Sequence, residues 1–234
     1  GRITSKQSKY LKYLSEFSIC DLSDLKNFSN GFNKYSLEVG FGNAENIQAE
    51  ALNNPDTLFV GSEVYVSGIG SLIAFIKEND IKNIRIFADD IRLLLDNEAI
   101  EIFDSVKIIC PDPWPKEKHH KRRLINSSFI QMLQCFMKKD SILYISTDWK
   151  NYADSISEIL KGSIFFKPSS NYFIPRTQLS KFERMGEIEG RQIFEFNYEK
   201  VSWVLNAVKK FSTAIALWLI LFFSSSLIDA MEQS

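Results

Sequence analysis

Short apolar runs alternate with longer stretches of helical period through most of this chain. Such alternation is typical of a parallel sheet covered by helices on both faces. Two further extended segments, joined by a long loop, follow near the end, as in a sheet that finishes with an antiparallel strand. We therefore predict an α/β fold. Its strands are expected at residues 35–39, 57–61, 84–88, 105–110, 142–146, 163–167 and 192–198, and its helices at 44–53, 68–79, 91–97, 127–138 and 151–160.

The length and charge of the chain limit what it can be. With 234 residues and 45% apolar content it can bury a core, and one main domain is expected over residues 31–200. Residues 1–30 have the character of a basic arm with one short helix, and residues 201–234 form an extension. Because 28 basic residues balance 29 acidic ones, attraction to phosphate must come from local clusters.

The cysteines and histidines give no sign of a metal site. Cys20, Cys110 and Cys135 are scattered without CxxC spacing, which disfavours both a disulfide framework and a zinc site. His119 and His120 are adjacent but have no third ligand at a suitable spacing. We therefore expect no metal, and a reducing, cytoplasmic location.

Residues 211–228 form an uncharged segment that follows two lysines. As a helix it would reach roughly 27 Å, just short of the roughly 30 Å hydrocarbon core of a membrane. Three interpretations stay open: a membrane-associated tail, a helix packed against the domain or a dimer partner, and an atypical extension. If the segment spans a membrane, the lysines favour a cytoplasmic position for the main domain.

A glycine turn is expected where the first predicted strand meets the first helix. Gly40 and Gly42 would let the backbone turn tightly, and the helix N-terminus that follows favours negative charge. Paired glycines can also be only a turn, and the full GxGxxG fingerprint is absent. The turn alone therefore indicates a nucleotide-like ligand only weakly.

Acidic residues stand at the ends of three successive predicted strands. Glu38 adjoins the glycine turn, Glu63 follows the second strand and Asp89 follows the third. In doubly wound sheets these strand ends meet at the edge that binds ligands. Three carboxylates there suit a ligand with an amino group, a ribose and a base. S-adenosylmethionine has these groups and lacks the pyrophosphate that a third glycine accommodates, so it is preferred, with NAD second.

The segment CPDPWPKEKHHKRR follows the fourth predicted strand at residues 110–123. Its prolines fix the path of the chain and would hold Asp112 and Trp114 rigidly at the same edge, although a proline turn with a buried tryptophan is the alternative. A carboxylate, an aromatic ring and a basic stripe together predict a pocket for one base of a polynucleotide. The basic residues expected to contact RNA phosphates are Lys118, Lys121, Arg122 and Arg123.

Taken together, these segments resemble the bacterial tRNA (guanine-N7-)-methyltransferase family. The similarity runs from about residue 36 to 198. Its most specific part is PDPWPK with the HKRR that follows, and Ala44 stands where the family usually has a glycine. Val66 and Ser180 also depart from the family pattern, in place of a basic residue and a threonine. The motifs in family order are EVGFGN at 38–43, GSEV at 61–64, PDPWPK at 111–116, HKRR at 120–123, TDW at 147–149 and SKFE at 180–183.

The resemblance implies a class I, Rossmann-like methyltransferase with a seven-stranded, mostly parallel sheet. It implies methyl transfer from S-adenosylmethionine to N7 of a guanine in the variable loop of tRNA. By the same analogy Glu38, Gly40, Gly42, Glu63, Asp89 and Asp112 would hold the cofactor, and Asp112 would be the catalytic carboxylate. The residues implied to face the substrate are Lys116, Asp148, Ser180, Lys181, Phe182 and Glu183.

Two other functions remain as alternatives. A non-catalytic RNA-binding module could keep the fold without the cofactor, and Ala44 in the glycine turn is the feature that favours it. A small-molecule methyltransferase is the other, disfavoured by the basic run. The sequence does not indicate an oligomeric state.

Overall fold

The computed structural model describes residues 3–28, 31–96, 99–176 and 179–201. The chain divides into two compact units, residues 1–200 and 201–234. The apolar segment 211–228 lies outside the described residues. Within them, no helix has the length and apolarity needed to cross a membrane.

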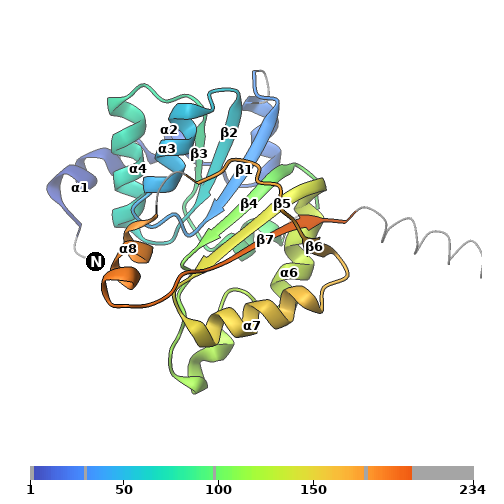
Figure 1. Ribbon diagram of the computed structural model, residues 1–234. Coiled ribbons are helices and arrows are strands. Elements are labelled where there is room, and N and C mark those ends of the chain that lie inside the picture. Colours follow the sequence, from blue (N-terminus) through green and yellow to red (C-terminus); the bar gives the residue numbers. More distant parts are fainter. Residues whose placement is uncertain (1–2, 29–30, 97–98, 177–178, 202–234) are drawn as a thin grey trace, which may run out of the picture. The chain divides into compact units, whose positions relative to one another are not determined.

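Seven strands form a single sheet in the order β3-β2-β1-β4-β5-β7-β6 (Figure 1). Strands β1 to β5 are parallel to one another, and β7 is antiparallel to its neighbours β5 and β6. The predicted α/β sheet with an antiparallel strand at its end is thus confirmed. The strands are β1 Lys34–Val39, β2 Thr57–Ser62, β3 Ile84–Phe87, β4 Phe103–Ile109, β5 Met137–Thr147, β6 Phe166–Pro168 and β7 Phe194–Lys200.

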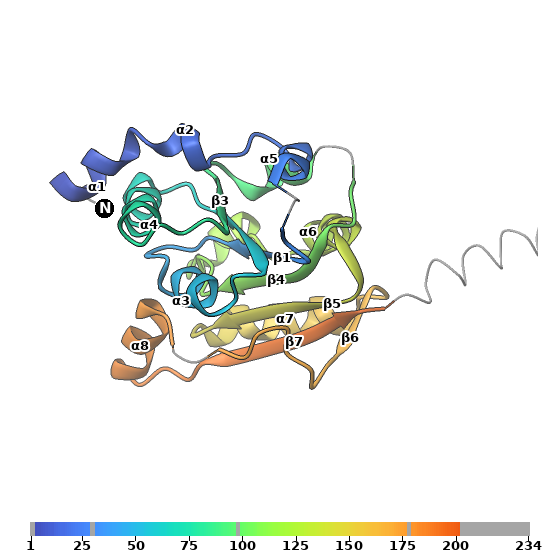
Figure 2. The ribbon, with the colours of Figure 1, turned by 90° about the horizontal axis from the view of Figure 1, so that it is seen from above.

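Successive side chains of the central strands enter two different cores. Leu58 and Val60 of β2 belong to one buried cluster and Phe59 to the other, as the alternation of a strand requires. One cluster includes residues of α3 and α4, and the other includes residues of α5, α6 and α7 (Figure 2). The predicted cover of helices on both faces is therefore confirmed. These helices are α3 Glu45–Asn53, α4 Val66–Glu78, α5 Ile91–Leu95, α6 Ser127–Leu133 and α7 Lys150–Lys161.

The segment before β1, predicted as a basic arm with one short helix, contains α1 Ser5–Leu11, α2 Leu14–Phe17 and a 3-10 helix, η1 Leu22–Phe28. Helix α1 packs along α4, where the side chain of Gln7 donates to Ser71 Oγ at 3.0 Å. Ser18 then forms a parallel β-bridge with Ile86 of β3. Three apolar side chains that follow, Ile19, Leu22 and Leu25, are buried. This segment therefore extends the core.

The helix predicted at 127–138 is shorter in the structure. Helix α6 ends at Leu133, a 3-10 turn, η3 Gln134–Phe136, follows, and β5 begins at Met137. Met137 pairs with Phe103 of β4, and both side chains are fully buried. Sheet pairing and burial therefore override the local helical pattern.

The sheet topology determines where a ligand can bind. Strand β1 pairs with β2 on one side and with β4 on the other, so the chain order reverses at β1. In open α/β sheets, the crevice beyond the carboxyl ends of the strands at such a reversal is where ligands bind. The ends of β1, β2 and β4 carry Glu38, Glu63 and Asp112 to this one edge.

Candidate active site

The turn between β1 and α3 uses left-handed backbone at three positions. Gly40, Gly42 and Ala44 have φ values of 69°, 53° and 65°. Glycine adopts this conformation freely, whereas an alanine there costs about 1–2 kcal/mol. Ala44 is nevertheless fully buried in the core, and its amide donates to the Phe41 carbonyl at 2.7 Å. The glycine turn therefore keeps its shape with alanine in place of the glycine usual in the family.

Glu63, at the end of β2, holds this turn. One carboxylate oxygen accepts the amide of Gly42 at 2.7 Å, and the other accepts the amides of Val64 and Tyr65 at 2.7 and 2.9 Å. Helix α4 also packs closely against the turn, because a Cβ added to Gly68 would lie 2.2 Å from the Gly42 carbonyl oxygen. Glu63 thus joins the ends of β1 and β2 into one rigid rim.

Glu38 lies at the end of β1 and is buried. Asn46, in the first turn of α3, donates to its Oε2 at 2.8 Å. Burial raises the pKa of Glu38 to about 7, although the Asn46 hydrogen bond opposes the rise. Glu38 is therefore poised to change charge near neutral pH. Asn46 was missed in the sequence, although its place just after the glycine turn was a usable signal.

A pocket with an empty volume of about 330 Å³ opens beside the glycine turn. Glu38, Gly40, Gly42 and Asn46 form part of its lining, and Ile109 at the end of β4 also contributes. The remaining wall is the start of helix α8, Lys181–Ile188, with its N-cap Ser180. Of the predicted cofactor residues, the structure thus brings Glu38, Gly40 and Gly42 to the pocket itself.

Three other predicted cofactor residues lie on the same edge without lining the pocket. Glu63 supports the turn through its hydrogen bond from the Gly42 amide, as described above. Asp89 is exposed after β3 and accepts the amide of Asp90 at 2.7 Å. Asp112 is exposed three residues beyond Ile109, on the loop that follows β4.

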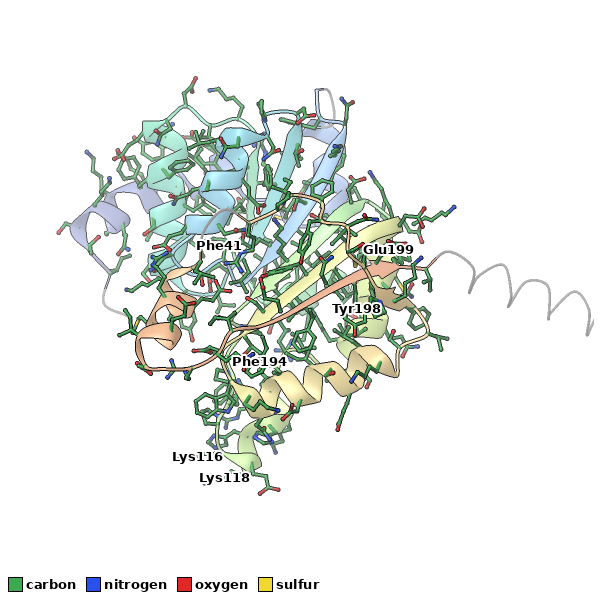
Figure 3. All side chains as sticks on the ribbon, viewed as in Figure 1. Phe41, Lys116, Lys118, Phe194, Tyr198 and Glu199 are labelled. Atoms are coloured by element: carbon green, nitrogen blue, oxygen red, sulfur yellow. The ribbon has the colours of Figure 1, made fainter. Side chains whose placement is uncertain are left out.

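The loop after β4 has left-handed backbone at two positions and projects most of its basic residues outward. Cys110 and Trp114 have positive φ values of 47° and 43°. The loop then forms a short 3-10 helix, η2 Glu117–Arg122, and the Arg122 guanidinium lies 4.8 Å from the centroid of the Trp114 ring. Figure 3 shows Lys116 and Lys118 at the outer tip of this loop. The exposed basic side chains are those of Lys116, Lys118, Lys121 and Arg122.

Arg123, predicted from the sequence to contact RNA phosphates, is buried, unlike its neighbours in the basic run. It is only 6% exposed, and its guanidinium donates to the Pro113 carbonyl at 2.9 Å and to Asn151 Oδ1 at 2.7 Å. It also stacks on the ring of Tyr152, 4.6 Å from the centroid, and burial lowers its pKa. Arg123 therefore ties the loop to α7. This role depends on residues far along the chain, which sequence spacing could not reveal.

The residues predicted to face the substrate divide into two groups. Lys181 and Phe182 are exposed at the start of α8, and Phe182 lies against Gly42, 3.5 Å from where a Cβ would stand. Glu183, also predicted to face the substrate, is instead fully buried. Its carboxylate closes a capping box with Ser180, a role that the SKFE spacing itself indicates.

Asp148, the remaining predicted substrate residue, is only partly exposed at the end of β5. Its carboxylate accepts a hydrogen bond from Arg191 Nε at 2.8 Å. It also packs against α8, since a Cβ added to Gly186 would lie 2.6 Å from Asp148 Oδ2. Across the part of the chain that the structure describes, no cluster of three or more His, Cys, Asp or Glu could hold a metal ion.

The sheet order and the pocket at the β1 reversal are those of the class I, Rossmann-like methyltransferase fold. Among solved structures, the fold is similar to the 16S rRNA methyltransferase KamB, with a TM-score of 0.55, 11% identity and coverage of 77% of this chain and 94% of that chain. It is also similar to a 16S rRNA (adenine(1408)-N(1))-methyltransferase from Catenulisporales acidiphilia with cosubstrate SAM. That match has a TM-score of 0.52, 14% identity and coverage of 77% and 91%. At these identities the likeness concerns the fold alone.

Sequence comparison identifies the family within this class. A family model described as a putative methyltransferase matches residues 33–196. The tRNA (guanine-N(7)-)-methyltransferase of Legionella pneumophila strain Paris is 36% identical over 176 residues, 73% of this chain and 74% of its own length. The enzyme of that name from Pseudoalteromonas translucida is 34% identical over 174 residues, 72% of each chain. The chain belongs to the tRNA (guanine-N7-)-methyltransferase family.

The two kinds of basic residue in the loop after β4 should respond differently to truncation. Arg123→Ala is expected to lower the free energy of unfolding by about 2 kcal/mol, because it removes charged hydrogen bonds to Pro113 and Asn151. Lys121→Ala, two residues away and exposed, should change it by less than about 0.5 kcal/mol. Urea unfolding of both variants measures the difference. Equal stabilities would contradict a buried, structural Arg123.

Proposed function

We propose that this protein transfers a methyl group from S-adenosylmethionine to N7 of a guanine in the variable loop of tRNA. The observation that carries the proposal is the shared edge of the sheet. The pocket beside the glycine turn, the exposed Asp112 and the outward basic loop all lie beyond the carboxyl ends of adjacent strands. Membership of the tRNA (guanine-N7-)-methyltransferase family supports this activity.

The residues of the pocket suit S-adenosylmethionine, which when bound supplies an electrophilic methyl group. A Cβ added to Gly40 would meet nothing within 4 Å, so the turn leaves open space for a ligand. The buried carboxylate of Glu38, oriented by Asn46, complements a positively charged amino group. Glu63 is proposed to meet the ribose hydroxyls while it holds the turn, and Asp89 to meet the edge of the base.

Guanine N7 carries a lone pair and no proton, so the reaction needs no general base. Acceleration is then expected to come from positioning and from stabilisation of developing charge. Asp112 is proposed to orient the guanine and to stabilise the positive charge that grows on its ring. Phe182 and Lys181, on the α8 wall of the pocket, are proposed to contact the base that enters.

The basic loop is proposed to bind the tRNA backbone. Its exposed cations are Lys116, Lys118, Lys121 and Arg122, and Arg123 holds the loop in place from within. Phosphate contacts of this kind position an RNA without reading its sequence. The loop also carries Asp112, so binding of the tRNA backbone and orientation of the guanine depend on the same segment.

Incubation with labelled S-adenosylmethionine and bulk tRNA, followed by digestion to nucleosides, tests the activity and the role of Asp112. The wild-type protein should yield labelled 7-methylguanosine. Asp112→Asn should lower turnover at least about 100-fold while changing tRNA affinity less than about threefold, because it removes charge stabilisation made mainly in the transition state. A different labelled nucleoside would refute the proposed function. Unchanged turnover in the variant would remove Asp112 from catalysis.

Cofactor affinity should depend on pH through Glu38. The pKa of Glu38 is raised to about 7, so the carboxylate is mostly neutral at lower pH and cannot pair with the cationic cofactor. Affinity measured by calorimetry should therefore rise up to roughly tenfold between about pH 6 and pH 8. Glu38→Gln should flatten this profile. A profile that is equally steep in the variant would assign the titration to another group.

Salt dependence of tRNA binding tests the basic loop. Replacing Lys118, Lys121 and Arg122 together by alanine should weaken binding and lower the slope of log affinity against log salt by about one unit per lost contact. Lys139→Ala is a control, because this exposed lysine lies near the amino end of β5, at the opposite edge of the sheet. A slope that is the same in the triple variant and the wild type would rule out phosphate binding by this loop.

A further inference from the structure

Helix α8, which forms one wall of the pocket, presents its apolar residues to solvent. Phe182, Met185 and Ile188 are 53%, 44% and 85% exposed. The buried residues of this helix are Glu183 and Gly186, neither of which has an apolar side chain. Surface helices normally attach to a domain through an apolar stripe. Helix α8 is therefore held in place by polar contacts.

The strongest of these contacts joins Glu183 to Arg176. Arg176 Nη1 donates to Glu183 Oε1 at 2.8 Å and to the Tyr144 hydroxyl at 2.9 Å, and Nη2 pairs with Glu183 Oε2. Glu183 also accepts the hydroxyl of Ser146 and the amide of Ser180, each at 2.7 Å. Tyr144 and Ser146 lie on β5, so Arg176 and Glu183 fasten the first turn of α8 to that strand.

The contacts between Arg176 and Glu183 keep both side chains charged. Burial alone would raise the pKa of Glu183, but its hydrogen bonds from Arg176 and Ser146 outweigh that effect and lower the pKa to about 2. Burial alone would lower the pKa of Arg176, and its bonds to Glu183 raise it instead. Both groups are therefore ionised at neutral pH.

The other ion pairs of α8 and the segment after it are more exposed. Arg184 pairs with Glu45 of α3 at 2.9 Å, and Arg191 pairs with Asp148 at 2.8 Å. Solvent weakens pairs of this kind, whereas removing one partner of a buried pair leaves an uncompensated charge. The bidentate Arg176–Glu183 pair should therefore dominate the placement of α8.

We propose that Arg176 is a positioning residue for the substrate-side wall of the pocket. Its guanidinium fixes the first turn of α8 and with it Ser180, Lys181 and Phe182 beside the glycine turn. Arg176 is not among the residues that line the pocket, so it acts through α8. The inference rests on the proposed function, because the wall is assigned to the guanine of tRNA.

Arg176→Lys tests the role while keeping the charge. Lysine cannot reproduce the two parallel bonds of the guanidinium, so α8 should lose its fixed position without an unpaired Glu183. We expect kcat/KM for tRNA to fall at least tenfold, with cofactor affinity within twofold of wild type. Arg184→Lys, in the more exposed pair, is the matched control and should change kcat/KM less than twofold. Wild-type kcat/KM in Arg176→Lys, or a matching loss of cofactor affinity, would overturn the proposal.

A double-mutant cycle with Phe182→Leu shows whether Arg176 acts through α8. If it does, the effect of Phe182→Leu on kcat/KM should shrink in the Arg176→Lys background, since the wall is already displaced. If the fold-change in the double variant equals the product of those in the two single variants, Arg176 and Phe182 act independently, and the inference is refuted.

Hydrogen exchange provides a readout that does not depend on activity. Amides of residues 181–188 should exchange at least tenfold faster in Arg176→Lys, with residues 150–161 of α7 unchanged. Unchanged protection of α8 would refute the positioning role even if the wild type methylates tRNA. A wild type that forms no 7-methylguanosine, combined with loosened α8, would instead refute the proposed function and leave the anchoring of α8 by Arg176 established.

Discussion

The hydrogen bonds that Glu63 accepts from the backbone around the glycine turn hold the pocket together. The turn needs left-handed backbone at Gly40, Gly42 and Ala44, a conformation that only surrounding contacts can maintain at a non-glycine position. Glu63 supplies one such contact by accepting the Gly42 amide, and the close approach of Gly68 supplies another. Because α3, α4 and the first turn of α8 all meet at this turn, a change in its path would move three sides of the pocket together.

A layer of buried charge lies under the segment that leads into α8. Lys107 of β4 pairs with Glu50 of α3 and donates to the Ile174 carbonyl at 3.2 Å, and Arg176 pairs with Glu183. Buried ions are costly unless each is paired, so these contacts leave residues 174–176 few alternative positions. Charge pairing thus organises the part of this sheet face that lies under residues 174–176, next to the apolar cluster formed with α3 and α4.

The central strands were predicted well because they are largely buried on both faces, so short segments rich in apolar residues mark them in the sequence. Prediction failed where a residue's environment comes from distant parts of the chain. Strand β5 begins as early as Met137 because this residue pairs with Phe103 of β4. The side chain of Arg123 points inward because it donates a hydrogen bond to Asn151 of α7. The burial of Glu183 depends in the same way on Arg176 and Ser146, although the serine three residues before it already indicated a helix cap. Spacing along a chain identifies the chemistry of such residues but not the direction in which they point.

Arg122 and Arg123 illustrate how one basic run can serve two purposes. The 3-10 helix η2 ends at Arg122, which remains outside against Trp114, and the chain then becomes extended at Arg123, whose side chain enters the interior. Arg123 bonds the carbonyl of Pro113, the residue next to Asp112. The backbone beside the proposed catalytic carboxylate is thus clamped by the same run that presents cations to solvent. Arg123 fixes the inner end of this loop to α7. We therefore expect that a tRNA bound to the outer cations leaves Asp112 in place.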